Sequence, residues 1–193
     1  FSIVKWTGDG SNSTIGHGLN VSPQMIFYKS TTASQNWTVL TTVIDGSADG
    51  LNLNTSVAKF NISAAGALPT ASVFGNVGFN TPMIGYCFTS ITGYSKVSTY
   101  TGNGNATGPI VTTLFQPTFV LIKRTDGVSN WNIYDTSRDP SNPSGPPLYP
   151  NLSNAEAGSQ AVNFLTTGFQ PAIAGGDLNE NNGTYLYLAI KEN

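Results

Sequence analysis

The sequence predicts an all-β protein of sandwich or jelly-roll type, built from two tandem copies of one unit. Three observations predict it. Short apolar segments without helical periodicity alternate with Gly, Pro and Asn, as strands joined by turns do. Charged residues make up only 9% of the chain, and its polarity comes from Asn, Ser, Thr and Gly, which suit exposed strand faces and turns. Finally, the sequence resembles itself when it is shifted by 94 positions.

The internal similarity is tightest between residues 6 and 45. Residues identical at this offset are mostly of structural type: Thr7, Gly8, Gly10, Pro23, Lys29, Thr31, Asn36, Trp37, Thr42 and Asp45. Farther on, Asn54 matches Asn151 at an offset of 97, and the closing apolar segments align in character at an offset of 102. The second copy therefore carries extra loop residues, in the proline-rich stretch 139–147 and near residues 175–183. We expect the copies to span residues 1–92 and 93–193 and to pack as one body with a pseudo-twofold relation.

Both copies are expected to contain the same order of strands. The predicted strands are residues 2–7, 15–19, 24–30, 36–43 and 83–88 in the first copy, and 96–101, 110–114, 118–123, 130–134 and 185–190 in the second. The continuous apolar run at residues 119–122 predicts a strand that is buried on both faces. A short turn of helix near residues 153–157 is the one expected exception to strands and loops.

Composition excludes several classes of function. Eight Lys and Arg residues are scattered over a chain of net charge −2, whereas a basic stripe would be needed to bind nucleic acid. No apolar run approaches the length of a membrane span. The single cysteine, Cys87, rules out an internal disulfide framework, and no Cys/His pattern predicts zinc. The acidic stretch from Asp45 to Asp49 lacks the alternating ligands of a calcium loop, so no metal or cofactor is expected.

Catalytic residues are hard to find, and the sequence predicts a protein that is not an enzyme. The only histidine, His17, falls on Val111 at the offset of 94, so it does not belong to a duplicated site. Paired carboxylates could act as in a glycosidase, but most of the acids lie in turn contexts such as Asp9-Gly10 and Asp126-Gly127, where a short acid caps its own turn. The pair that repeats, Asp45 and Asp139, fits such a turn.

The aromatic residues allow two interpretations. Trp37 and Trp131 occupy equivalent positions, and the more economical interpretation is a core tryptophan in each copy. The alternative is a platform of exposed rings that stacks on uncharged sugars. The candidate ligand-binding residues are then Trp37, Trp131, Tyr100, Tyr134 and Tyr149. We expect specialised contacts in the loops 138–150 and 174–184, because duplicated scaffolds diverge in their loops.

Several linear motifs resemble a repeat domain of marine tailed-bacteriophage virion proteins of the tail-fibre type. They extend over nearly the whole chain, at residues 1–8, 15–19, 23–26, 84–88, 93–104, 119–126 and 150–156. The resemblance implies a location on the virion surface, contacts with other virion proteins and a homo-oligomeric state. It supplies no catalytic residues.

Together these observations predict a structural surface domain of a virion, from a tail fibre or another adhesion appendage that contacts the host. Two alternatives stay open. One is a capsid decoration protein, and the other is a non-catalytic carbohydrate-binding module for a host surface glycan.

Overall fold

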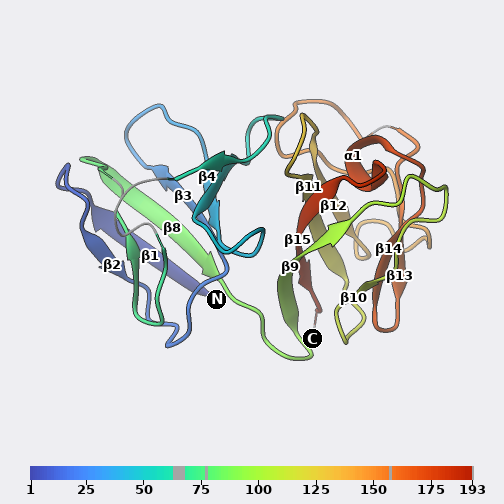
Figure 1. Ribbon diagram of the computed structural model, residues 1–193, viewed down its shortest axis with the longest axis horizontal. Helices are drawn as coiled ribbons and strands as arrows, with labels where there is room; N and C mark the ends of the chain where they lie inside the picture. The colour runs from blue at the N-terminus through green and yellow to red at the C-terminus, as the bar shows by residue number, and fades with distance from the viewer. Residues whose placement is uncertain (63–67, 77, 157, 193) are drawn as a thin grey trace. The chain divides into compact units, whose positions relative to one another are not determined.

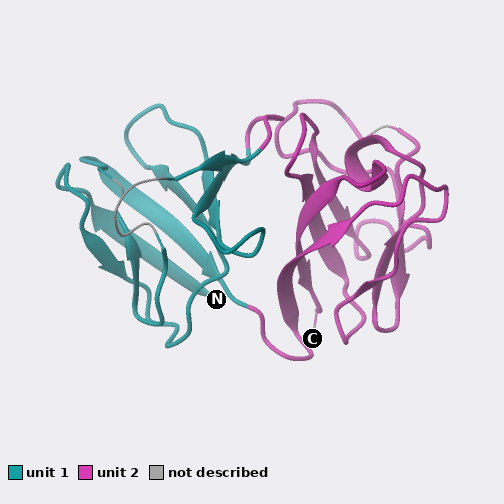
Figure 2. Ribbon diagram, in the orientation of Figure 1, with its two compact units in different colours: residues 1–53, 59–89 teal, residues 54–58, 90–193 magenta. Residues whose placement is uncertain are grey.

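The computed structural model describes residues 1–62, 68–76, 78–156 and 158–192. Nearly all of its regular structure is β-strand, and the described residues contain one helix, α1 (Gly176–Asn179). The predicted all-β class is therefore confirmed. The chain divides into unit 1, residues 1–53 and 59–89, and unit 2, residues 54–58 and 90–193 (Figure 2). This division differs from the predicted boundary at residue 92, and it assigns the segment 54–58 to unit 2.

Unit 1 is a two-layer β-sandwich. Its larger sheet has the strand order β1-β8-β3-β4-β5-β6, and its smaller sheet pairs β2 with β7. The strands are β1 (Ser2–Thr7), β2 (Thr14–Gly16), β3 (Met25–Ser30), β4 (Thr38–Thr41), β5 (Asp49–Asn52), β6 (Phe60–Asn61), β7 (Val73–Gly75) and β8 (Pro82–Phe88). Figure 1 shows β8 between β1 and β3. The core lies between the layers, where Phe74 of β7 packs with Ile26, Leu40 and Cys87 of the larger sheet.

Unit 2 repeats this plan with a larger second layer. A four-stranded sheet has the order β12-β11-β15-β9, and a three-stranded sheet has the order β10-β14-β13 (Figure 1). The strands are β9 (Ser95–Thr101), β10 (Val111–Thr112), β11 (Phe119–Arg124), β12 (Trp131–Asp135), β13 (Val162–Leu165), β14 (Gly168–Pro171) and β15 (Thr184–Ile190). Val120, Tyr134 and Tyr187 of the first sheet form one core with Val162 and Phe169 of the second.

The central strands of the two units pair in the same register. Met25 faces Phe88 in unit 1, and Phe119 faces Ile190 in unit 2, so β3 maps on β11 at an offset of 94 and β8 maps on β15 at 102. Both offsets equal those read from the sequence. This agreement supports the predicted duplication, which itself stays a prediction.

One loop arrangement explains why both copies need a glycine after their first strand. A Cβ atom at Gly8 would collide with the carbonyl oxygen of Phe79, and one at Gly102 with that of Glu180. A buried asparagine holds each loop from beneath. The Asn76 amide donates to the Ser11 carbonyl at 3.1 Å, and the Asn179 amide donates to the Asn105 carbonyl at 2.7 Å.

Other differences from the predicted elements are local. The central strands lie within one or two residues of their expected bounds, and β11 is buried at four consecutive positions, as its apolar run predicted. Five strands were not predicted: β5, β6, β7, β13 and β14. The expected helical turn near residues 153–157 lies partly outside the described residues, and its described part is not helical.

Candidate functional site

The structure separates the five candidate aromatic residues into buried and accessible ones. Trp131 and Tyr134 have no exposed surface, and Tyr100 is 9% exposed. A buried ring cannot stack on a ligand from solution, so the prediction of a platform is wrong for these three residues. Trp37 and Tyr149 are half-buried and stay candidates.

The buried tyrosines belong to the core of unit 2. Tyr100 stacks on Tyr185 with their ring centroids 4.8 Å apart, and its hydroxyl donates to the Leu178 carbonyl at 2.7 Å. Burial raises the pKa of Tyr134 far above its ordinary value, so its hydroxyl stays protonated. These side chains fill the space between the two sheets, which is a structural role.

Trp37 lies beside a row of rings that sequence reasoning missed. We call this surface the aromatic face of unit 1, defined by Phe1, Phe27, Trp37, Tyr86 and Phe88. The ring of Phe1 lies 4.9 Å from Phe88 and 6.4 Å from Tyr86, and Phe27 lies 5.3 Å from Phe88. Trp37 continues the row, 6.1 Å from Tyr86. The rings therefore form one contiguous surface.

Strand alternation places these rings on the outer side of the larger sheet. Successive residues of a strand point to opposite faces, so Cys87 enters the core while Tyr86 and Phe88 point away from it. The strand register aligns Tyr86 with Ile3 on one side and with Phe27 on the other. Phe1 is 56% exposed and Ile3 is 58% exposed, whereas Phe27, Tyr86 and Phe88 are half-buried.

Two lysines share the aromatic face. Lys5 faces Ile84 in the β1–β8 pair, and Ile84 faces Lys29 in the β8–β3 pair, so the three side chains lie in one row. The Lys29 ammonium lies 5.8 Å from the centroid of the Trp37 ring, within the range of a cation–π interaction. The face thus combines apolar ring surface with positive charge.

The same face of unit 2 has a different character. At the positions of Phe27, Tyr86 and Phe88, unit 2 has Leu121, Leu188 and Ile190. Leu121 and Leu188 are buried. The same face of unit 2 keeps one half-buried ring, Phe119, so the row of several contiguous rings distinguishes unit 1 among the described residues.

His17 has a structural role. Its imidazole accepts the Leu19 amide hydrogen at Nδ1 over 3.2 Å, and its Nε2 lies 3.1 Å from the Thr70 carbonyl, so the Nε2–H tautomer satisfies both contacts. The residue is 2% exposed. The sequence offset predicted Val111 as the counterpart of His17 in unit 2, but strand pairing shows that the counterpart is Thr113. The Thr113 hydroxyl accepts the amide hydrogen of Phe115, two residues later, just as His17 accepts that of Leu19.

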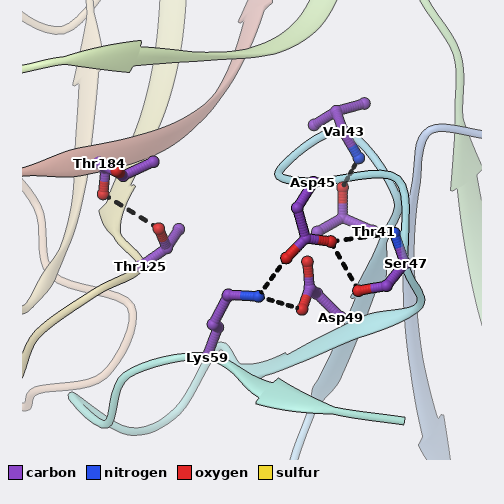
Figure 3. Close-up of polar contacts among 8 residues, drawn as sticks. All are labelled: Thr41, Val43, Asp45, Ser47, Asp49, Lys59, Thr125 and Thr184. Atoms are coloured by element: carbon purple, nitrogen blue, oxygen red, sulfur yellow. Dashed lines mark hydrogen bonds and ion pairs between the residues drawn. The ribbon is translucent and has the colours of Figure 1, made fainter. Parts of the chain in front are cut away.

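In the acidic stretch from Asp45 to Asp49, which was considered for calcium, both carboxylates bind the side chain of Lys59 (Figure 3). The Lys59 Nζ lies 2.7 Å from an Asp45 oxygen and 2.6 Å from an Asp49 oxygen. The hydrogen bond from Lys59, together with those from Ser47, holds the pKa of Asp45 well below its usual range. Lys59 therefore supplies the positive charge that a cation would bring. Among the described residues, no group of three or more His, Cys, Asp or Glu side chains could hold a metal ion.

Asp139, the counterpart of Asp45, is a turn residue, as the sequence predicted. It accepts the backbone amides of Ser141 at 3.0 Å and Gly145 at 2.8 Å. The Gly145 amide contributes most to lowering the pKa of this carboxyl group to about 2. Its hydrogen-bonding capacity is thus used to shape the proline-rich loop.

One of the two loops in which we expected specialised contacts, residues 174–184, takes part in a polar cluster. The Asp177 carboxylate, in α1, accepts the Asn130 backbone amide at 3.1 Å and its side-chain amide at 3.0 Å. Half-buried Tyr149 lies near enough for Asp177 to contribute to its raised pKa, after burial itself. The two hydrogen bonds connect α1 to the residue before β12 and so fix the position of the loop that contains α1.

No helix among the described residues has the length and apolarity needed to cross a membrane. Comparison with curated proteins gave no match. Comparison with solved structures gave no match either. A protein-family comparison matched residues 1–193 to the family described as "Domain of unknown function (DUF7483)". Because the match covers the whole chain, the protein belongs to this family.

Proposed function

We propose that this chain is a non-catalytic surface domain of a virion, of the tail-fibre type, which contacts host glycans through the aromatic face of unit 1. The contiguous, partly exposed row of rings carries the glycan part of the proposal. The C–H faces of sugar rings pack on aromatic rings, and an apolar patch kept at a protein surface commonly marks an interaction site. The virion part is supported by the motifs that resemble phage tail-fibre repeats.

The rings face outward, although the scaffold does not require them to be aromatic. Unit 2 forms the same strand register with Leu and Ile at the positions of three of these rings. Aromatic residues at Phe27, Tyr86 and Phe88 therefore supply something beyond the fold, and recognition of a ligand is the simplest purpose.

A glycan array probed with the purified chain tests the contact. The ring-replacement variant, Phe27→Leu with Tyr86→Leu and Phe88→Ile, gives unit 1 the residues of unit 2 and should abolish binding while the chain stays folded. A control variant, Ile110→Ala with Val128→Ala, removes exposed apolar surface from unit 2 and should bind normally. Equal binding by both variants would exclude the aromatic face as the contact.

Labelling of intact particles with an antibody against the chain, viewed by electron microscopy, tests the location. We expect label on tail appendages. Label on the capsid lattice alone would favour the alternative of a decoration protein, and unlabelled particles would contradict a virion location.

A further inference from the structure

We infer that the aromatic face of unit 1 takes an anionic glycan, whose acidic groups bind Lys5 and Lys29 while its sugar rings pack on Tyr86, Phe88 and Phe27. This inference rests on the proposed function, because it names the ligand class of the same face. It also revises the uncharged ligand that the low charge of the whole sequence suggests.

The strand register brings the positive charges next to the rings. Lys5, Ile84 and Lys29 form one row across β1, β8 and β3. Neighbouring strands lie about 4.8 Å apart, so the Cα atoms of the two lysines are separated by roughly 10 Å. The ring of Tyr86 projects from the same face of β8 two residues along the strand, about 7 Å away. A short oligosaccharide laid on the rings would therefore place its acidic groups within reach of both lysines.

The charges around this face favour an anion. Strands β1, β8 and β3 contain Lys5 and Lys29 but no acidic residue. The acid nearest in register on this face is Asp49 in β5, whose side chain is fully buried and salt-bridged to Lys59. Among the described residues, neither Lys5 nor Lys29 forms a salt bridge. A positive surface on a chain of net charge −2 provides local charge complementarity to an acidic ligand.

Unit 2 lacks this combination at the equivalent positions. Lys5 is replaced by Thr99, and the counterpart of Lys29, Lys123, is buried with its ammonium hydrogen-bonded to the Arg124 carbonyl. Lys29 instead lies over the half-buried ring of Trp37, and this contact limits the positions that its ammonium can take. Among the described residues, the two accessible lysines and the row of rings thus occur together in unit 1 and not at the equivalent positions of unit 2.

Titration calorimetry with the full chain can test the inference with three polysaccharide probes. Alginate carries carboxylates, dextran sulfate carries sulfates, and dextran is neutral. We expect one or both acidic probes to bind more tightly than dextran, and more weakly as the salt concentration rises. The acidic probe that binds identifies the acidic group.

Two matched charge variants complete the test. Lys5→Glu with Lys29→Glu should weaken binding of the acidic probe by roughly tenfold or more. Lys96→Glu with Lys191→Glu changes the net charge equally but lies in unit 2, so it should leave binding unchanged.

The outcomes separate this inference from the proposed function. Suppose that neutral and acidic probes bind equally, and that binding is lost in the ring-replacement variant but not in Lys5→Glu with Lys29→Glu. This result would overturn the anionic ligand and leave the proposed glycan contact intact. The anionic ligand at this face would also be overturned if both charge variants weakened the binding of the acidic probe equally. No binding of any probe, or self-association of the chain that the ring-replacement variant abolishes, would count against both.

Discussion

The two units use one strand register but differ in how much of the outer sheet face is exposed. Part of this face is buried in unit 1 as well, at Met25, Val39 and Leu51. In unit 1 this face carries Tyr86 and Phe88 with partial exposure, whereas in unit 2 the corresponding Leu188 is buried. The inner faces are more alike, because each must fill a sandwich core. The comparison shows that the pairing pattern and inner packing define the scaffold, while the outer face is free to acquire a separate role.

The units also share a loop support that a fixed-offset comparison does not reveal. Asn76 and Asn179 are 103 positions apart, unlike the offsets of the neighbouring strands, and yet both are fully buried. Asn76 also accepts the indole N–H of Trp6 at 2.8 Å, whereas Asn179 accepts the Asn103 backbone amide at 2.8 Å. Each side chain thus satisfies partly buried polar groups of the turn after the first strand of its unit.

Replacing the two equivalent tryptophans should give the largest difference in stability between changes in the two units. Trp131→Ala deletes a fully buried ring and should cost about 3–5 kcal/mol of unfolding free energy. Trp37→Ala deletes a half-buried ring and should cost less, about 1–2 kcal/mol. Urea unfolding followed by circular dichroism measures both. Equal losses would contradict the expectation that the fully buried Trp131 contributes more to stability than the half-buried Trp37.

Removing the buried asparagines should have effects of similar size in both units. Asn76→Ala and Asn179→Ala each leave partly buried carbonyl or N–H groups without these partners, so each should lower the unfolding free energy by about 1–3 kcal/mol. Asn181→Ala, at an exposed position, is the control and should change it by less than about 0.5 kcal/mol. Hydrogen exchange should show the loss in the loops after β1 and β9. A neutral result at either asparagine would show that the two loops are not supported alike.

Lys123 predicts a pH dependence that originates in unit 2. Burial lowers the pKa of this lysine from 10.5 to about 8. Between about pH 8 and 10 the unfolded chain binds the lysine proton while the folded chain has released it, so stability should rise with pH, by on the order of 1–2 kcal/mol. Above pH 10 the trend should reverse, because burial raises the pKa of Tyr187 to about 12 and keeps it protonated only in the folded state.

Urea midpoints at pH 7.5 and 9.5 measure this effect. Lys123→Met should remove the rise, whereas Lys96→Met should keep it. A rise that survives in Lys123→Met would assign the pH dependence to another group.

Ring replacement should have the smallest effect on stability for each residue that is changed. The variant Phe27→Leu with Tyr86→Leu and Phe88→Ile keeps apolar side chains of similar type on a partly exposed face. We expect a loss below about 1.5 kcal/mol per site, measured by the urea midpoint. A larger loss at these positions would mean that the rings serve mainly to hold unit 1 together.

The sequence was sufficient to predict the strands that pair at the centre of each unit. Their alternation and their repetition at 94 and 102 positions are strong signals, and β1 has the bounds expected for it. Strands β13 and β14 were missed because they are short and β14 contains Gly168 and Pro171, which favour a loop interpretation. The counterpart of His17 was misassigned because the offset of 94 does not extend to β10.

The candidate site was harder to predict than the fold. Trp37 was identified, but Tyr86 and Phe88 belong to an apolar strand that favours a core interpretation. Alternation predicts that two faces exist, and it does not reveal which of them another layer covers. Tyr100 and Tyr134 lie in strands that were predicted, but they were candidates for an exposed platform, whereas both enter the core of unit 2.

The shared register has a consequence for folding. Because the two units pair their strands in the same register, β15 of unit 2 could pair with β1 of unit 1 during folding. Such exchange between domains is a known form of misassembly in multidomain and repeat proteins. Side-chain volume opposes this error. A Cβ atom at Gly85 would lie 3.1 Å from the Trp6 ring, and the residue that β15 would bring there is Tyr187. The Trp6–Gly85 pair thus makes β8 the strand that fits unit 1, and it helps to keep two similar sandwiches from exchanging strands.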